Sequence, residues 1–593
     1  MPPVFHRVLV TLYTAVAAAF ALTAPVPALA DFTIGSPNVA TADPVVPRPP
    51  TTPCVVNLYT NQTYADFSDK PFTYAPPPNC AGPWEKVVLA LDFDVTAGRQ
   101  FDRTGVVWLN DVPIYFGTTQ EPSATVAPSW HIERDLTDYS ALLTAAHAGY
   151  VSLGNFVGTS GGVAYTGIIH GSATLYFYPG GNGNLGRRPD QVVPLNTNGA
   201  ASLYTSSDQL AKTLTLPRNI ERAFLDVYTQ SQNQDEFWFF DLPDDIAPVF
   251  FDTGKTAFKE GEVAIDGQPA GIAPVYPWIY TGGADPILWR PIPAVQTLAF
   301  EPYRVDLTPF VGLLSDGNPH TVAVSVHNAA TYFSTAATLL LYLDHGTTQV
   351  TGGITGNTLT AVPQANVVEN VTVGADGQSG SGTVEVSAQR KYTISGTAVT
   401  SHGTVTTTIA GNIGFDSKQN LNETSDGGTY VQDTVQSTTI DLTTTRSGGG
   451  SNSVAHEQRS YPLTFDYEFR TAADGSATLH SNVDQEFKQQ VTISGNGASS
   501  KTAQLDNHIH NTVTRNYDTS GALVSTPANA SQSYAYADSF GACYSRTISA
   551  QNRLLASVTD GQGCPDGANA LTWRDAFSSY AAKWFGVNWA LLP

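Results

Sequence analysis

The sequence predicts an all-β protein: two jelly-roll-like antiparallel β-sandwich domains in tandem, followed by a C-terminal β-rich domain. Short apolar or alternating runs, separated by turns rich in Gly, Asn and Pro, fill most of the chain, and helical periodicity is nearly absent. A nine-residue segment also recurs 171 positions further on. The 593 residues exceed what one hydrophobic core can organise, so we expect three or four domains.

Residues 1–30 have the organisation of a signal peptide. His6 and Arg7 form a short basic start, and an uncharged stretch follows and ends in Ala28-Leu29-Ala30, a small-residue cleavage site. No later stretch is apolar enough to span a bilayer. We therefore expect a soluble protein that is secreted or periplasmic, without membrane contact once the signal is removed. Residues 31–53, rich in proline and without periodicity, are expected to form an extended arm.

Residues 54–180 are predicted to form the first jelly-roll domain. The run 87–95 is apolar and passes into alternation, which is typical of a half-buried strand. Residues 106–115 predict a hairpin that turns at Asn110-Asp111. A further strand is expected at 173–178.

Residues 195–345 are predicted to form the second domain, because an internal repeat relates them to the first. The segment 135–143 (DLTDYSALL) matches 306–314 (DLTPFVGLL), and β-rich sequence follows each. A strand opened by Glu and a basic residue precedes each match, at Glu85-Lys86 and Glu221-Arg222. Agreement of several features in the same order favours two domains of one design, each with two packed antiparallel sheets.

Residues 350–593 are predicted to form a third, C-terminal β-rich domain. Thr, Ser, Gly and Asn dominate, with alternating runs such as 382–387 and 404–409 that indicate long strands polar on both faces. Near the end, Trp573, Phe577, Tyr580 and Trp584 recur at helical spacing, which is typical of a stripe that packs into a core.

The four cysteines agree with export from the cytoplasm. Cys54 and Cys80 lie near the start and Cys543 and Cys564 near the end, so three pairings are possible. Local pairing, Cys54 with Cys80 and Cys543 with Cys564, is the simplest, and each bridge would contribute about 3 kcal/mol. No CxxC occurs, and no cysteine has a catalytic setting. A cysteine nucleophile or structural zinc is therefore not expected.

The charge balance is strongly acidic. The formal net charge is −22 at pH 7, although charged residues are only 13% of the chain. Such a field repels nucleic acid and anionic membranes, so neither is an expected partner. A protein of this charge suits acidic surroundings, where carboxylates become neutral and self-repulsion falls.

Two short segments each place a carboxylate against aromatic residues at a predicted strand end. Asp102 lies in 101–109 (FDRTGVVWL), and Glu236 lies in 234–239 (QDEFWF). Apolar surroundings raise the pKa of a carboxyl group, which is one way to make an acid or base. The alternative is a strand-end carboxylate that holds a neighbouring Arg or a turn amide.

Both carboxylates are expected to face one cleft between the two sandwich domains. Domain interfaces are preferred ligand sites. A cleft with two carboxylates and several aromatic rings suits a sugar, because the rings stack on its C–H faces while the carboxylates bind hydroxyl groups. The tryptophans expected to contribute are Trp108, Trp130, Trp238, Trp278 and Trp289.

The segment 276–291 is dense in aromatic residues, Gly and Pro, which predicts an ordered loop. In one interpretation it folds over the seam between domains. In the other it lines the substrate site, and Arg290 holds a carboxylate or a sugar oxygen.

Two other motifs are not expected to carry chemistry. The run 158–162 (GTSGG) fits a nucleophile-elbow pattern but lacks the strand–helix setting that gives the pattern its meaning. His508 and His510 share a strand face, which can suit a metal, but an isolated pair in a polar β-domain is usually surface decoration. We expect no metal and no cofactor.

Several motifs that fall in order between residues 54 and 345 resemble those of the peptide N-glycanase A-type amidases. They are Phe101-Asp102-Arg103, Val107-Trp108-Leu109, Gln120-Glu121-Pro122, Asp235-Glu236-Phe237-Trp238, Tyr280-Thr281-Gly282-Gly283, Leu288-Trp289-Arg290-Pro291 and Val305-Asp306-Leu307-Thr308-Pro309-Phe310 with Leu313-Leu314. The resemblance implies cleavage of the amide between an asparagine side chain and the innermost N-acetylglucosamine of an N-linked glycan. It also implies tolerance of core α1,3-fucose.

A more distant resemblance is to the flavobacterial N-glycanase, which is built of two jelly rolls. It implies that Asp102 is the primary catalytic acid and that Glu236 is a second functional acid. A third acid follows the first domain's Leu-Leu pair in that enzyme, and its nearest counterpart here is Asn155. That role is therefore altered or moved, with Asp235 and Glu121 as the alternatives.

These observations lead to one functional hypothesis and two rivals. The hypothesis is a secreted, metal-independent glycoamidase that acts on N-glycosylated peptides and proteins. Asp102 is the main acid/base, Glu236 positions and activates water, and Arg103 orients Asp102 or a substrate oxygen. Trp238, Trp289 and Arg290 line the site for the innermost sugars. The rivals are a glycoside hydrolase using the same carboxylates and a non-catalytic glycan-binding protein or adhesin.

Overall fold

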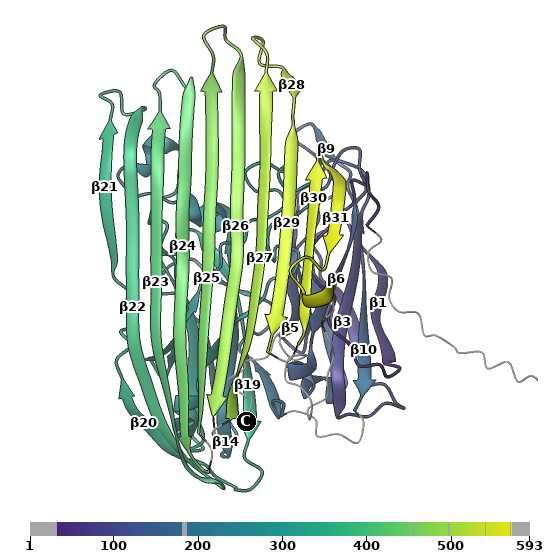
Figure 1. Ribbon diagram of the computed structural model, residues 1–593, viewed down its shortest axis with the longest axis vertical. Coiled ribbons are helices and arrows are strands. Elements are labelled where there is room, and N and C mark those ends of the chain that lie inside the picture. Colours follow the sequence, from purple (N-terminus) through teal and green to yellow (C-terminus); the bar gives the residue numbers. More distant parts are fainter. Residues whose placement is uncertain are drawn as a thin grey trace, which may run out of the picture.

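The computed structural model describes residues 32–180, 187–450, 452–495, 498–539, 541–567, 569 and 571. β-strands dominate this part of the chain and helices are short, so the all-β prediction is confirmed (Figure 1). The signal peptide expected at 1–30 and the aromatic stripe at 573–584 lie outside the described residues. None of the helices in the described ranges is long and apolar enough to cross a membrane.

The first sandwich is a jelly roll of two four-stranded antiparallel sheets, ordered β1-β10-β3-β6 and β2-β7-β4-β5. A separate small hairpin, β8–β9, is inserted before β10. The predicted turn at Asn110-Asp111 joins β4 to β5, and both residues have positive φ, as a two-residue hairpin turn requires. The strands are β1 (Cys54–Tyr64), β2 (Lys70–Tyr74), β3 (Trp84–Val95), β4 (Thr104–Leu109), β5 (Val112–Thr118), β6 (Ser129–Asp135), β7 (His147–Ser152), β8 (Gly158–Ser160), β9 (Val163–Tyr165) and β10 (Ile169–Pro179).

The second sandwich repeats this topology, with sheets ordered β11-β19-β14-β17 and β13-β18-β15-β16. The short strand β12 extends the first sheet by pairing with β19. The strands are β11 (Gln191–Pro194), β12 (Ala201–Leu203), β13 (Leu210–Thr215), β14 (Ile220–Gln232), β15 (Glu260–Ile265), β16 (Gln268–Pro274), β17 (Tyr303–Asp306), β18 (Pro319–His327) and β19 (Tyr332–Leu343).

The sequence repeat marks the same structural device in both jelly rolls. After β6, the Asp135 carboxylate accepts a bond from the Thr137 amide at 2.9 Å, and after β17 the Asp306 carboxylate accepts one from Thr308 at 2.9 Å. The next leucine amide bonds to the sandwich's long central strand in both cases, Leu136 to Val87 and Leu307 to Ala223. Each Asp thus bonds the first amide of a short helical turn that leads back across the sandwich. The turns in the described chain are η1 (Thr137–Tyr139), η2 (Leu142–Thr144), η3 (Asn233–Phe240), η4 (Ala247–Phe250), η5 (Thr308–Phe310), α1 (Val311–Leu314) and η6 (Pro565–Gly567).

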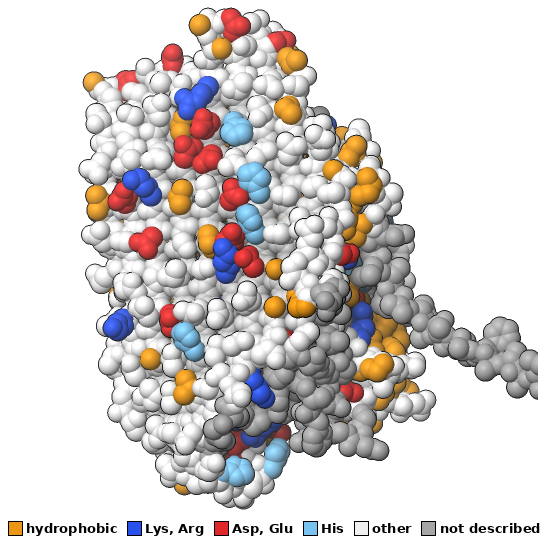
Figure 2. Space-filling view, viewed as in Figure 1, with side chains coloured by type: hydrophobic (Ala, Val, Ile, Leu, Met, Phe, Trp, Pro, Cys, Tyr) orange, Lys and Arg blue, Asp and Glu red, His pale blue; other side chains and the backbone are white. Residues whose placement is uncertain are grey.

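The C-terminal part forms one twelve-stranded antiparallel sheet of unusually long strands, which faces the viewer in Figure 1. Its outer face carries mostly uncharged polar side chains, with a sparse scatter of charged residues and histidines, as the predicted polar alternation requires (Figure 2). The strands are β20 (Thr351–Asn357), β21 (Ala365–Val373), β22 (Gly380–Thr400), β23 (Gly403–Glu423), β24 (Thr429–Gly448), β25 (Ser453–Thr471), β26 (Ala477–Gly495), β27 (Ala498–Tyr517), β28 (Leu523–Ser525), β29 (Ala528–Asp538), β30 (Cys543–Gln551) and β31 (Leu554–Asp560).

The inner face of the long sheet packs on the second jelly roll and shares its core. The ring of Phe239 stacks on Phe465 at 5.9 Å between centroids, and Trp238 contacts Phe415 at 6.4 Å. Amide side chains add directed contacts, since the Gln432 Nε2 donates to the Phe240 carbonyl at 3.0 Å. The sheet and the second jelly roll therefore form one continuous hydrophobic unit.

The N-terminal arm is extended, as expected, and it ties distant parts of the chain together. Gly35 and Ser36 exchange backbone bonds with Leu555 of β31, and the Ala42 amide donates to Gln532 Oε1 of β29 at 2.6 Å. The Val46 amide then donates to Glu133 of the first jelly roll at 2.8 Å. The arm thereby links the C-terminal sheet to the first sandwich.

Both disulfides follow the local pairing that was the simplest prediction. Cys54 bonds Cys80, and Cys543 bonds Cys564. Each bridge closes a short loop, the first at the start of the first jelly roll and the second beside β30.

A buried ion network joins the two jelly rolls. Arg304 of β17 donates to both oxygens of Asp226 on β14, at 2.6 and 2.8 Å, and to Asp138 of η1 at 2.6 Å. The Tyr139 hydroxyl also donates to Asp226 at 2.7 Å. One guanidinium therefore neutralises a carboxylate from each sandwich.

Arg304→Met is predicted to lower the free energy of unfolding by about 3–5 kcal/mol, because it leaves the buried Asp138 and Asp226 carboxylates without their cation. Denaturant unfolding followed by tryptophan fluorescence measures the change. The control is Arg470→Met, which removes a partly exposed ion pair to Glu468 and should cost about 1 kcal/mol or less. Equal small losses in both variants would contradict the assigned role of Arg304.

Candidate active site

The carboxyl groups of Asp102 and Glu121 lie close together, beside the backbone of Gly282. Asp102 lies directly before β4, and Glu121 follows β5, the neighbouring strand of the same sheet. The Gly282 amide donates to Asp102 Oδ2 at 3.1 Å, and the Asp102 amide donates to Glu121 Oε2. Gly282 lies 180 positions from Asp102 and comes from the second jelly roll's long loop.

The space around residue 282 is too limited for a side chain. A Cβ added there would lie 2.6 Å from Asp102 Oδ1 and 3.1 Å from Glu121 Oε2. Any side chain would therefore push into the two carboxyl groups. The absent side chain lets the loop backbone approach and supply an N–H donor to Asp102.

The segment that carries Glu121 forms hydrogen bonds both with Arg103 and with the loop that contains Gly282. The Thr119 amide donates to the Arg103 carbonyl at 2.8 Å, and the Arg103 amide returns a bond to Thr119 Oγ1 at 2.9 Å. Thr281 Oγ1 donates to the Thr119 carbonyl at 2.8 Å, and Gln120 Nε2 donates to the Trp289 carbonyl at 3.1 Å. These bonds fix Glu121 relative to both Asp102 and the Gly282 loop.

Glu236 lies in η3, immediately after the long strand β14 of the second jelly roll. Its side chain is partly exposed and makes no hydrogen bond or ion pair with any described residue. Burial, and then the nearby charge of Asp102, raise the pKa of Glu236 to about 7. Glu236 therefore lies within electrostatic reach of Asp102 and is free to contact a ligand.

The three carboxyl groups hold protons more tightly than isolated ones. Burial raises the pKa of Asp102, although the Gly282 amide and the Arg103 guanidinium oppose that rise. Burial and the Asp102 charge raise the pKa of Glu121 to about 8. Like charges in a partly buried site repel, so the group keeps at least one proton near neutral pH.

Two arginines flank the carboxyl groups. Arg103 donates to Gln100 Oε1 at 2.7 Å, and its guanidinium lies 5.7 Å from the centroid of the Phe101 ring. Arg290 donates to the Pro122 carbonyl at 2.7 Å and, more weakly, to that of Glu121 at 3.5 Å. In this structure Arg290 thus braces the backbone around Glu121.

The structure does not place the five tryptophans as stacking faces for a sugar. Trp108, Trp130, Trp238, Trp278 and Trp289 are all buried. Trp289 instead donates from Nε1 to the Gly283 carbonyl at 2.9 Å, and Trp238 packs against the long sheet. Sequence patterns show that a ring is apolar but not which side of a loop it occupies, and all five rings are core residues.

The side chains of Asn155 and Asp235 are also buried and bond to other protein groups. Asn155 is buried and donates from Nδ2 to the carbonyls of Tyr64 and Gly167, at 3.0 and 3.1 Å. Asp235 is buried, pairs with Lys259 at 3.4 Å and accepts bonds from the amides that follow Ala329. Of the candidates for the third acid, Glu121 is the one whose carboxyl group meets Asp102.

Two accessible aromatic pairs near the carboxyl groups were missed by sequence reasoning. Phe101, beside Asp102, contacts Tyr165 at 5.6 Å between ring centroids. Tyr204 contacts Tyr332 at 5.7 Å, and the Glu236 charge is one cause of the raised pKa of Tyr332. Phe101 and Tyr204 are well exposed. Adjacency to Asp102 was the available signal for Phe101, whereas Tyr165, Tyr204 and Tyr332 carry no local signal.

The loop 276–291 rests on the inner face of the long C-terminal sheet. Arg515 forms a two-pronged ion pair with Asp285, at 2.5 and 2.6 Å. Asn511 Nδ2 donates to the Leu288 carbonyl at 3.0 Å, and Gln485 Nε2 donates to the Pro277 carbonyl at 2.6 Å. Polar side chains of β26 and β27 therefore fix the position of the loop that brings Gly282 to Asp102.

The possible metal ligands lie away from these carboxyl groups, and most of them already have protein partners. Among the described residues, Glu221, Asp344 and His402 bring ligand atoms within 4.8 Å of one another. Arg187 pairs with Glu221, and the Ser401 amide and hydroxyl donate to Asp344. His508 and His510 each contact Asp484 Oδ1, at 3.1 and 3.0 Å, on the outer face of the sheet.

Comparison with known proteins places the chain among N-glycan amidases. Residues 44–359 match the family model described as peptide N-acetyl-beta-D-glucosaminyl asparaginase amidase A. A Prunus dulcis protein named peptide-N4-(N-acetyl-beta-glucosaminyl)asparagine amidase A is 27% identical over 542 residues, which cover 87% of this chain and 91% of that protein.

Solved structures of N-glycanases are also similar to part of the chain. PNGase F from Flavobacterium meningosepticum is 13% identical, with a TM-score of 0.34, over 49% of this chain and 96% of that one. The structure of PNGF-II is 12% identical, with a TM-score of 0.33, over 49% of this chain and 65% of that one.

Asp102→Asn is predicted to lower the pKa of both Glu121 and Glu236, because it removes a like charge that raises each of them. Both values should stay above the ordinary range, since burial is the larger cause. Carbon-13 NMR titration of protein labelled at the glutamate carboxyl carbon measures the change, with Glu121→Gln and Glu236→Gln to assign the signals. Unchanged titrations in the Asp102 variant, equal to those of the exposed-site control Asp416→Asn, would show that the three groups do not interact.

Proposed function

Because the chain belongs to the peptide N-acetyl-beta-D-glucosaminyl asparaginase amidase A family, we propose that the Asp102 site performs the family's hydrolysis. The enzyme is a peptide-N4-(N-acetyl-β-glucosaminyl)asparagine amidase. It cleaves the amide between an asparagine side chain and the innermost N-acetylglucosamine of an N-linked glycan. Water becomes part of a new aspartate, and the glycan leaves as a glycosylamine.

The observation that carries the assignment to this site is the meeting of Asp102 and Glu121 at Gly282, within reach of Glu236. Amide hydrolysis needs a group that takes a proton from water and gives one to the leaving nitrogen. Carboxyl groups with raised pKa can do both near neutral pH, because their two protonation states are similar in free energy. Accessible rings beside them suit a substrate that is half sugar and half peptide.

Asp102 acts as the base and then as the acid. The Gly282 amide and the Arg103 guanidinium stabilise its carboxylate form against the effect of burial. It takes a proton from the attacking water as oxygen bonds to the amide carbon. It then passes that proton to the nitrogen as the carbon–nitrogen bond breaks, and atoms and charge balance.

Glu236 and Glu121 play supporting parts. Glu236, without a protein partner, holds the water with an acceptor oxygen and orients it towards the amide carbon. Glu121 keeps its proton up to about pH 8, which limits the negative charge beside Asp102. Arg103, held by its bond to Gln100, stabilises the oxyanion of the tetrahedral intermediate, since a fixed cation in a partly buried site is effective there.

The aromatic pairs bind the substrate on either side of the carboxyl groups. Phe101 with Tyr165 belongs to the first jelly roll, and Tyr204 with Tyr332 belongs to the second. Rings on both sandwiches would hold the innermost sugar and the peptide in one orientation, and fixed orientation is a large part of catalysis. The buried Trp238 and Trp289 act by supporting the elements that carry Glu236 and Gly282.

Secretion and activity in acid surroundings complete the proposal. Two disulfides suit an oxidising compartment. The raised pKa values of Glu121 and Glu236 suit a pH below 7, where both carry protons. The net charge of −22 also becomes smaller as acid groups titrate.

Asp102→Asn is predicted to reduce release of glycan from a denatured glycoprotein by about 10²- to 10⁴-fold, because the variant keeps the volume of the side chain but cannot take a proton. The control is Asp416→Asn on the exposed face of β23, which should retain full activity. Mass spectrometry in heavy-oxygen water reads the products. An amidase leaves Asp carrying the heavy oxygen. A sugar left on Asn would identify a glycoside hydrolase, and an unchanged glycopeptide would identify a binding protein.

The kcat/KM is predicted to be highest in mild acid and to fall between about pH 7 and 8, where Glu236 and Glu121 lose their protons. The sign follows from the raised pKa values: each group stays neutral below its pKa, and the added negative charge above it opposes ionised Asp102 and the oxyanion. Glu236→Gln should remove the step near pH 7 and leave the step near pH 8. An activity that keeps rising through pH 8 would contradict these roles.

A further inference from the structure

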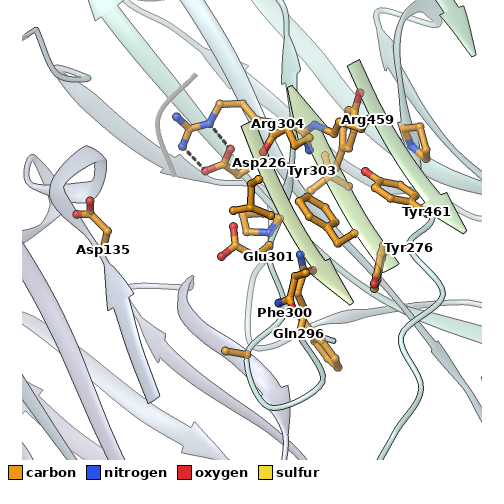
Figure 3. Close-up of a pocket in the computed structure, with 18 of the residues that line it drawn as sticks. Asp135, Asp226, Tyr276, Gln296, Phe300, Glu301, Tyr303, Arg304, Arg459 and Tyr461 are labelled. Atoms are coloured by element: carbon orange, nitrogen blue, oxygen red, sulfur yellow. Dashed lines mark hydrogen bonds and ion pairs between the residues drawn. The ribbon is translucent and has the colours of Figure 1, made fainter. Parts of the chain in front are cut away.

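A cavity of about 330 Å³ lies where all parts of the described chain meet (Figure 3). The N-terminal arm contributes Thr41 and Asp43, and the first jelly roll contributes β6. The second jelly roll contributes β14, β16 and the segment 293–306, and the inner face of the long sheet closes the remaining side. None of Asp102, Glu121, Glu236, Gly282 or Arg290 lines this cavity. It is therefore separate from the Asp102 site.

The cavity carries more acidic groups than basic ones. Eight carboxyl groups line it, against three arginines and one histidine, with no lysine. Most of the acids have protein partners: Asp138 and Asp226 pair with Arg304, Glu457 pairs with Arg459, and Asp43 accepts a bond from Asn507. The balance disfavours an anion, and the three guanidinium groups disfavour a bare metal cation.

Two polar groups in the lining have no protein partner. Glu301 is exposed to the cavity, and no described residue forms a hydrogen bond or ion pair with its carboxylate. The hydroxyl group of Tyr303 is buried and also lacks a partner, while its ring contacts the Arg459 guanidinium at 4.8 Å. The buried Tyr303 hydroxyl costs free energy while it has no partner, so it marks a place where a ligand can bond. The exposed Glu301 carboxylate is free to accept a bond from the same ligand.

Aromatic rings supply much of the remaining wall. Tyr276, Phe300, Tyr303 and Tyr461 appear among the labelled residues around the hollow in Figure 3. Tyr276 packs against Tyr461 at 4.9 Å, which fixes the ring positions. Fixed rings together with a few free polar groups are the usual composition of a small-molecule site.

We propose that this cavity is a second carbohydrate site that binds one or two neutral sugar units. The rings of Tyr276 and Tyr303, 5% and 8% exposed, contact the sugar's C–H groups. The Glu301 carboxylate accepts a bond from a sugar hydroxyl group, and the Tyr303 hydroxyl exchanges one with another. The volume is at the lower end of ligand pockets, so the cavity holds a terminal unit and not a whole branched glycan. The proposal does not depend on the reaction at Asp102.

Saturation-transfer NMR on the full chain tests the proposal with the methyl glycosides of N-acetylglucosamine, mannose and galactose. We expect at least one of them to bind to the wild type and to Gly282→Val, which fills the Asp102 site. Glu301→Ala should weaken that binding about tenfold or more, as expected when a bond to a charged group is lost. Ala299→Phe, which adds volume to the cavity wall, should abolish it.

Two controls separate this site from other effects. Glu369→Gln on the exposed strand β21 should leave sugar binding unchanged, and all variants are checked for an unaltered melting temperature. Glycan release should stay at the wild-type rate in Glu301→Ala and Ala299→Phe, so failure of the sugar site and failure of the proposed amidase site are distinguishable. The proposal is overturned if no neutral sugar binds, if N-acetylneuraminic acid or calcium binds instead, or if binding is lost in Gly282→Val and kept in both cavity variants.

Discussion

A chain of backbone bonds, from the Gly282 amide to the Asp102 carboxylate and from the Asp102 amide to the Glu121 carboxylate, is the constraint on which the rest of the site depends. Asp102 and Glu121 come from adjacent strands of the first jelly roll, and the Gly282 amide comes from the second. A Cβ at residue 282 would lie 2.6 Å from Asp102 Oδ1 and 3.1 Å from Glu121 Oε2, so glycine permits the approach without displacing either carboxyl group. Burial, and then the nearby Asp102 charge, raise the pKa of Glu121 to about 8 and that of Glu236 to about 7. Local geometry thus produces the proton-holding groups that hydrolysis needs.

The long C-terminal sheet has a clear physical role in this arrangement. Gln485, Asn511 and Arg515 hold the loop that carries Gly282, and Phe415 and Phe465 support the turn that carries Glu236. Both elements approach Asp102 from the second jelly roll and rest on one continuous surface. A hydrogen-bonded sheet of long strands is stiff, so it can fix two loops relative to each other. The N-terminal arm ties this sheet to the first jelly roll, where Asp102 lies.

Much of the fold could be predicted from the sequence, because it depends on local signals. Alternation located the strands, and the Asp135 and Asp306 repeats identified two sandwiches of one topology, since each Asp bonds the first amide of the same turn. Only part of the site could be predicted from the sequence. Asp102 and Glu236 stood out as acids among aromatic residues, but the bond to Gly282 joins positions 180 apart and has no local pattern. The tryptophans show the same limit, because periodicity finds apolar rings without showing which side of a loop they cover.

The most direct test of the central claim is a crystal structure of Asp102→Asn with an uncleaved N-glycopeptide. Asn at this position preserves the shape of the site while stopping the reaction. The account predicts the scissile amide beside residue 102, above the Gly282 backbone, with Glu236 facing the amide carbon and the innermost sugar against Phe101 or Tyr332. A glycopeptide whose scissile amide lies far from residues 102 and 236 would contradict the account.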